Sequence, residues 1–134
     1  MQLNKSTRYA LYAAMEMTQA GDRPVSVRQV ARRYRIPADA LAKVFQQLVR
    51  SGIAVGTRGI GGGYRLARPA SRLTVLDVIG IYEPPRPAGE CLLAARPAPP
   101  CRDFPGCRLR RLFDEVDELS RSTLQSVTLE TLMR

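Results

Sequence analysis

Three cysteines, Cys91, Cys101 and Cys107, are the clearest candidates for metal or redox chemistry in this sequence. Nine residues separate the first two and five the last two, which is not the paired C-x-x-C spacing of a zinc ribbon. Three thiolates on one loop can bind a soft metal centre, either an iron-sulfur cluster or zinc. Three unrelated thiols, two of them forming an adventitious disulfide, explain the spacing equally well. The chain has no histidine to serve as a fourth ligand.

The segment that carries these cysteines is rich in proline. Residues 84–107 contain seven prolines and show little helical periodicity, so we expect a loop. A loop this long that holds every cysteine of the chain is better explained by function than by packing.

A second set of residues has the types and spacing needed to bind nucleic acid. We expect base contacts from positions near the start of one helix: Asp39, Ala40 and Lys43. Two glutamines further along can contact bases or phosphates: Gln46 and Gln47. Phosphate contacts are expected from nearby arginines: Arg28, Arg32, Arg33 and Arg50.

A glycine-rich stretch follows that helix and suits a DNA-binding hairpin. Two strands, 53–58 and 64–68, flank the tip, in which Gly59 and Gly61 let the backbone approach a surface closely. Arg58 and Arg65 stand on either side of the tip. Arginine suits the narrow, negative minor groove, so we expect this wing to enter it.

The elements that position these residues form a helix-turn-helix. Ser26 is a plausible N-cap for a first helix, and Ile36-Pro37 predicts a turn, because proline disfavours helical geometry in the residue before it. A second helix then runs from Pro37 to about Ser51, and Gly52 ends it. Its predicted apolar stripe consists of Leu41, Val44, Phe45, Leu48 and Val49.

Further helices are expected on both sides of this unit. A first helix covers residues 3–17, and Thr74 with Asp77 caps a short one after the wing. A long amphipathic helix begins after Cys107, and we interpret it as a dimerisation helix. Thr128 caps a last turn, whose leucines should fold back on the body of the protein. The apolar stripe of the long helix contains Leu109, Leu112, Phe113, Val116 and Leu119.

These elements predict a mainly α fold with a small β-hairpin wing, that is, a winged helix-turn-helix with a long C-terminal dimerisation helix. We expect three parts: a DNA-binding domain at 1–83, a cysteine loop at 84–107 and a dimerisation helix with its C-terminal turn at 108–134.

The charge distribution supports a polyanionic partner. Residues 1–86 hold 14 basic and 5 acidic side chains, whereas 87–134 hold 7 of each. The excess therefore coincides with the expected DNA-binding part. Arg8 and Glu16 interrupt any signal-peptide core, so we expect a cytoplasmic protein without a membrane partner.

An enzyme is not expected. The stretch "GIGGGY" lacks the third glycine of a dinucleotide fingerprint and the lysine of a P-loop, and it leads into a strand. The absence of histidine removes the commonest general base.

Five stretches carry a family pattern: "MQLNKSTRYAL", "TRGIGGGYRLAR", "TVLDVIGIYE", the three-cysteine loop and "TLETLM". Together they resemble the winged-helix regulators that include IscR, NsrR and RirA, the Rrf-two family, over essentially the full length. The resemblance implies a homodimeric transcriptional regulator, expected to be a repressor, that binds a pseudo-palindromic operator. It also implies one iron-sulfur cluster per subunit, 2Fe-2S or 4Fe-4S, which senses iron, nitric oxide or redox state.

By this resemblance, all three cysteines are cluster ligands. Two departures leave the fourth ligand open: Arg110 stands where IscR-like members have histidine, and Arg8 where NsrR-like members have aspartate. The candidates are Glu90, Asp103, Asp114, a small thiol or solvent. The alternative is a DNA-binding sensor of the same fold without a cluster, in which Cys101 and Cys107 form a reversible disulfide or all three thiolates bind zinc.

Overall fold

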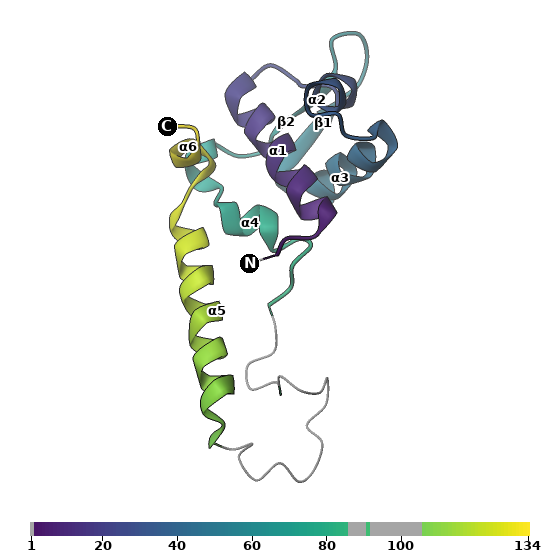
Figure 1. Ribbon diagram of the computed structural model, residues 1–134. Coiled ribbons are helices and arrows are strands. Elements are labelled where there is room, and N and C mark those ends of the chain that lie inside the picture. Colours follow the sequence, from purple (N-terminus) through teal and green to yellow (C-terminus); the bar gives the residue numbers. More distant parts are fainter. Residues whose placement is uncertain (1, 86–90, 92–105) are drawn as a thin grey trace. The chain divides into compact units, whose positions relative to one another are not determined.

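The computed structural model describes residues 2–85, 91 and 106–134. Contacts divide the chain into two compact units. One is Met1–Pro84 together with Leu124–Arg134, called the body below, and the other is Pro85–Thr123. The body contains helices α1 to α4, helix α6 and both strands (Figure 1). Within the described residues, no helix is both long and apolar enough to cross a bilayer.

Helix α1 (Lys5–Ala20) packs against α3, α4, β2 and α6 within the body. Its buried face is largely alanine, which lets neighbouring backbones approach closely. The expected span of 3–17 was wrong at both ends. The Asn4 side chain accepts the Thr7 backbone N–H at 2.9 Å, so the helix begins at Lys5. No residue interrupts the helix before Gly21, whose φ of 64° ends it.

Helix α2 (Val27–Tyr34) begins at the predicted cap. The Ser26 hydroxyl accepts the Gln29 backbone N–H at 3.1 Å, and the Gln29 side chain accepts the Ser26 N–H at 3.0 Å. These two bonds satisfy donors that the first turn leaves free. Arg35 then adopts a left-handed conformation, with φ 54°, and closes the helix.

Helix α3 (Ala38–Arg50) follows Pro37, as predicted, and Gly52 after its end has φ 75°. Most of the expected apolar stripe is buried: Leu41, Val44, Phe45 and Leu48. Val49 is the exception, since it is 37% exposed and faces the wing rather than the core. The helix therefore buries a narrower face than its sequence pattern suggested.

The wing is a two-stranded antiparallel hairpin of β1 (Ala54–Thr57) and β2 (Gly63–Leu66). Its register pairs Ala54 with Leu66, Val55 with Arg65, Gly56 with Tyr64 and Thr57 with Gly63. The backbones of Val25 and Tyr64 exchange two hydrogen bonds of 2.8 Å, which attach the hairpin to the segment before α2. The Tyr64 ring also stacks on Phe45 of α3, with centroids 4.6 Å apart. The wing thus has a fixed position relative to α3.

The polypeptide after the wing forms the short elements η1 (Ala70–Arg72) and α4 (Val75–Ile79). Thr74 and Asp77 cap α4 reciprocally, as predicted. Val75, Val78 and Ile79 are buried, so α4 contributes to the core.

The C-terminal helix α6 (Leu129–Leu132) returns to the body. The Leu129 N–H donates to the Leu73 carbonyl at 2.8 Å, and the Val75 N–H donates to the Val127 carbonyl at 2.8 Å. Leu129 is completely buried, which confirms that this turn folds back on the body. The division into parts at 1–83, 84–107 and 108–134 remains a prediction; contacts alone group 124–134 with the body.

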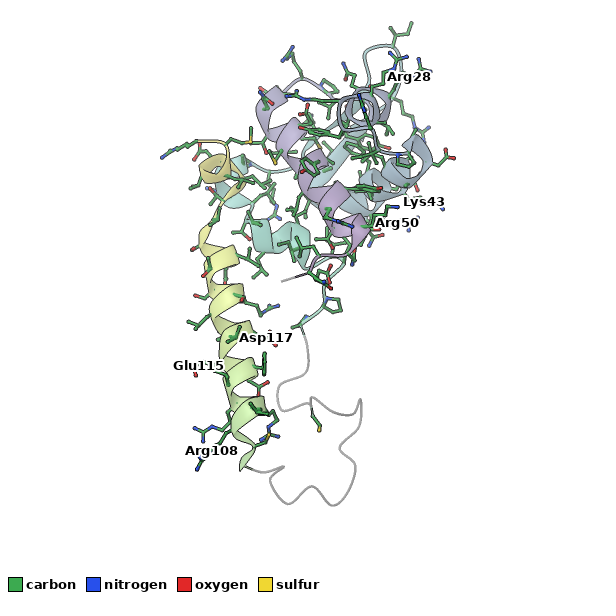
Figure 2. All side chains as sticks on the ribbon, in the orientation of Figure 1. Arg28, Lys43, Arg50, Arg108, Glu115 and Asp117 are labelled. Atoms are coloured by element: carbon green, nitrogen blue, oxygen red, sulfur yellow. The ribbon has the colours of Figure 1, made fainter. Side chains whose placement is uncertain are left out.

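Helix α5 (Arg108–Ser126) is long and amphipathic. Its apolar stripe is exposed in the single chain: Leu109, Leu112, Phe113, Val116 and Leu119. Charged side chains, including Arg108, Glu115 and Asp117, project from the same helix (Figure 2). This pattern suits a helix that buries one side against another chain.

Candidate nucleic-acid interface and cysteine segment

The exposed side of α3 carries the residues predicted to contact bases. Asp39, Lys43 and Gln46 are exposed, and Ala40 and Gln47 are half-buried. Lys43 and Arg50 both reach outward from α3 (Figure 2). These residues share one side because the opposite side is anchored in the core by the buried stripe of α3.

A hollow lies on each side of this helix. One, of about 460 Å³, is lined by Gln46, Val49 and Arg50 of α3 and by Gly56, Thr57, Arg58, Gly63 and Tyr64 of the wing. The other, of about 550 Å³, is lined by Pro37, Asp39, Ala40, Lys43, Val44 and Gln47, with Ser6 and Tyr82 opposite. The exposed side of α3 is therefore a ridge between two depressions.

The wing tip is a tight turn with basic flanks. The Gly62 N–H donates to the Gly59 carbonyl at 3.0 Å, and Gly59 and Gly61 have φ values of 99° and 76°. Residues that carry a side chain rarely adopt these backbone conformations, so glycine is required at both positions. Arg58 directly precedes the tip, Arg65 lies on β2 opposite Val55, and both are exposed. The predicted wing residues thus all belong to one hairpin.

The arginines of α2 differ in their availability. Arg28 and Arg32 are exposed, and Arg28 projects from α2 (Figure 2). Arg33 is also exposed, but it pairs with Glu16 of α1 at 3.2 Å. Glu16 also accepts the Tyr34 hydroxyl at 2.6 Å, and burial together with this bond raises the pKa of Tyr34. Arg33 therefore links α2 to α1, a role that the sequence did not suggest.

A cluster of hydrogen bonds at the start of α1 was also missed. The Glu83 carboxylate accepts the Asn4 backbone N–H at 2.7 Å and the hydroxyl of the buried Thr7 at 2.8 Å. These donors, Asn4 first, lower the pKa of Glu83. The Asn4 side chain donates to the Tyr82 carbonyl at 3.2 Å. No local pattern signals these contacts, because nearly eighty residues separate the partners.

The cysteine segment is described only in part. Cys91 and Cys107 are half-buried and carry free thiols. Cys101 lies outside the described residues, as do Glu90 and Asp103. Among the residues that the structure does describe, no three His, Cys, Asp or Glu side chains gather as a metal site. Two free thiols fit soft-metal or thiol chemistry, and the complete ligand set remains a prediction.

The architecture of α1 to α3 with its hairpin is that of a winged helix-turn-helix protein, which confirms the predicted fold class. The chain belongs to the Rrf2 family, whose model, described as an iron-dependent transcriptional regulator, matches residues 3–134. The resemblance to the family of IscR is thereby confirmed.

Relatives cover the whole chain. It is 35% identical over 134 residues to a protein of Rhodopseudomonas palustris named as the HTH-type transcriptional regulator BadM, covering 100% of this chain and 82% of the relative. Protein aau3 of Rhizobium meliloti is 31% identical, with coverages of 100% and 86%.

Solved structures share the fold at lower identity. CymR, the global cysteine regulator of B. subtilis, has a TM-score of 0.78 at 22% identity and covers 99% of this chain and 96% of its own. IscR of T. potens has a TM-score of 0.76 at 22% identity, with coverages of 99% and 86%.

Proposed function

We propose that this protein is a homodimeric transcriptional repressor whose affinity for a pseudo-palindromic operator depends on an iron-sulfur cluster at Cys91, Cys101 and Cys107. The observation that carries the DNA-binding proposal is the ridge of α3 between two hollows, with a basic wing beside it. A helix in the major groove has a sugar-phosphate backbone on each side, and two hollows can receive them. Regulation, rather than catalysis, is the proposed role, in the cytoplasm.

Contacts are assigned by position on this surface. Base edges meet the exposed residues of α3, beginning with Asp39 and Lys43, while Arg28 and Arg50 contact phosphates. Arg58 and Arg65 line the minor groove with the glycines of the wing.

The dimer forms through the apolar stripe of α5. Its five large side chains are 43–62% exposed in the single chain, and a second copy covers them. The two α3 helices of the dimer then lie about 34 to 36 Å apart, or a multiple of this distance, and each enters the major groove at one half-site of the operator.

Each subunit would hold one cluster, 2Fe-2S or 4Fe-4S. The cluster would supply a metal-thiolate centre that is assembled or lost in response to iron, nitric oxide or redox state. Cys91 and Cys107 carry free thiols, and the matching family model is described as iron-dependent. A change of about 1–3 kcal/mol in operator binding between the two states would switch a promoter.

A second candidate is a thiol or zinc sensor of the same fold. It is favoured by the free thiols and by the structural similarity to CymR, a regulator named for cysteine. This candidate shares the DNA-binding surface and differs only in what the cysteines hold.

The deciding experiment is an anaerobic purification with absorbance spectra, iron and sulfide assays, and operator titrations of the loaded and stripped protein. Visible charge-transfer bands, stoichiometric iron and a changed operator affinity support the cluster. Colourless, iron-free protein after reconstitution favours the thiol or zinc sensor. Equal operator affinity of both forms refutes control by a cluster.

DNA binding is tested separately with Arg58→Ala. Loss of this minor-groove arginine should weaken operator binding by about 1–3 kcal/mol. Arg72→Ala is the matched control, because Arg72 is exposed on η1, which packs with α6. Equal effects of the two substitutions would contradict the assignment.

A further inference from the structure

Ile60 at the tip of the wing is fully exposed, with a relative accessibility of 109%. It is the only large apolar side chain in the turn, and its neighbours Gly59 and Gly61 have no side chains. A single exposed apolar side chain is ordinary on a protein surface, so the surroundings of Ile60 decide whether it meets a partner.

The turn holds Ile60 outward by its geometry. The hydrogen bond from Gly62 to Gly59 and the φ of 76° at Gly61 match a type II turn, in which Ile60 is the first central residue. A Cβ atom on Gly62 would overlap the Thr57 carbonyl oxygen, so the tip is packed against its own backbone. The Ile60 side chain is therefore held on a tightly packed, hydrogen-bonded turn.

The surroundings of Ile60 indicate the partner. The wing, residues 53–68, contains no carboxylate, and Arg58 and Arg65 flank its tip. One isoleucine is too small to anchor a protein interface of ordinary size. The minor groove is about 6 Å wide, and phosphates line its edges, so it matches a narrow tip that carries one apolar side chain and has an arginine on each strand side of the hairpin.

We infer that Ile60 is a specificity-determining residue that contacts the floor of the minor groove and selects A·T base pairs beneath the wing. This inference rests on the proposed DNA-binding function. The floor of an A·T pair carries only acceptors, whereas a G·C pair adds the exocyclic amino group of guanine. Isoleucine can satisfy neither acceptors nor donors, so at a G·C pair it would cover one more unsatisfied polar group, the amino donor, than at an A·T pair.

The test uses the full-length protein and an operator selected by it from random DNA, with the base pairs under the wing located by footprinting. Replacing those A·T pairs by G·C should weaken binding of the wild type about tenfold or more. Replacing them by inosine·C should restore it, because inosine lacks the amino group while its major-groove edge resembles guanine.

Two variants separate the apolar contact from shape. Ile60→Val removes one methylene and should bind within about fourfold of the wild type. Ile60→Thr has nearly the shape of the valine variant but is polar, and should bind about tenfold more weakly or worse, with reduced preference for A·T. Neither variant changes charge, so the salt dependence should stay that of the wild type.

The outcomes are distinct. Threonine at this position with wild-type affinity, or with undiminished preference for A·T over G·C, overturns the role of Ile60 and leaves the proposed function intact. Failure of inosine·C to restore binding overturns readout of the minor-groove floor. Failure of the wild type to select any sequence overturns the proposed DNA-binding function itself.

Discussion

Leu129→Ala tests how much the packing of the C-terminal helix α6 contributes to the stability of the body. Leu129 has no exposed surface, and its backbone N–H is bonded to Leu73. Truncation of a fully buried leucine leaves a cavity and costs about 3 kcal/mol or more. For a chain of this size that corresponds to a fall of roughly 10 °C in Tm.

Leu132→Ala is the matched control, since Leu132 belongs to the same short helix but is 42% exposed. It should cost less than about 1 kcal/mol, because much of its side chain is already in water. Urea unfolding followed by far-UV circular dichroism measures both, since the chain has no tryptophan. Protein concentration must be fixed, because the unfolding of the proposed dimer would depend on it. Equal losses in the two variants would refute the assigned burial of Leu129.

Three further predictions concern the acid stability, the wing and the long helix. Glu83 has a pKa below its ordinary value because Asn4 donates to it, so its stabilisation is present above the unfolded pKa and disappears as pH falls through the folded pKa. The Tm difference between the wild type and Glu83→Gln should therefore shrink on acidification, and a constant difference from pH 3 to 7 would contradict this. Gly63→Ala places a Cβ 2.5 Å from the Val25 carbonyl oxygen and should break the backbone hydrogen bonds between Val25 and Tyr64. The substitution should therefore lower the free energy of unfolding by about 1–3 kcal/mol and weaken operator binding. An unchanged Tm would argue against this. Val116→Asp puts a charge in the exposed stripe of α5 and should give monomers in sedimentation experiments, whereas persistent dimers would place the interface elsewhere.

Features that depend on neighbouring residues were predictable from the sequence. The caps at Ser26, Thr74 and Thr128 are hydrogen bonds to backbone N–H groups three residues away, so residue type and spacing suffice to find them. Gly52 ends α3 as predicted for the same reason. The helix-turn-helix and the wing follow from such local signals together with apolar periodicity.

Features that depend on tertiary packing were not predictable. Val49 continues the apolar period of α3, yet only the position of the wing decides that it faces a hollow. The pairing of Arg33 with Glu16 was not predicted because Glu16 lies on another helix. The carboxylate of Glu83 bonds to residues at the other end of the body's sequence. Among the candidate cluster ligands, Cys101 is outside the described residues, so the full set remains a prediction.

The attachment of both ends of one segment to the body has a consequence for engineering. The first stretch of the body ends at Pro84, next to Glu83, which is bonded to Asn4. The second stretch begins at Leu124, shortly before Val127, which is bonded to Val75. In the sequence, Pro85–Thr123 is thus an insertion between two stretches of the body. Under the proposed function, exchange of this insertion between relatives should transfer the response to the signal and leave the operator sequence unchanged, because α3 and the wing belong to the body.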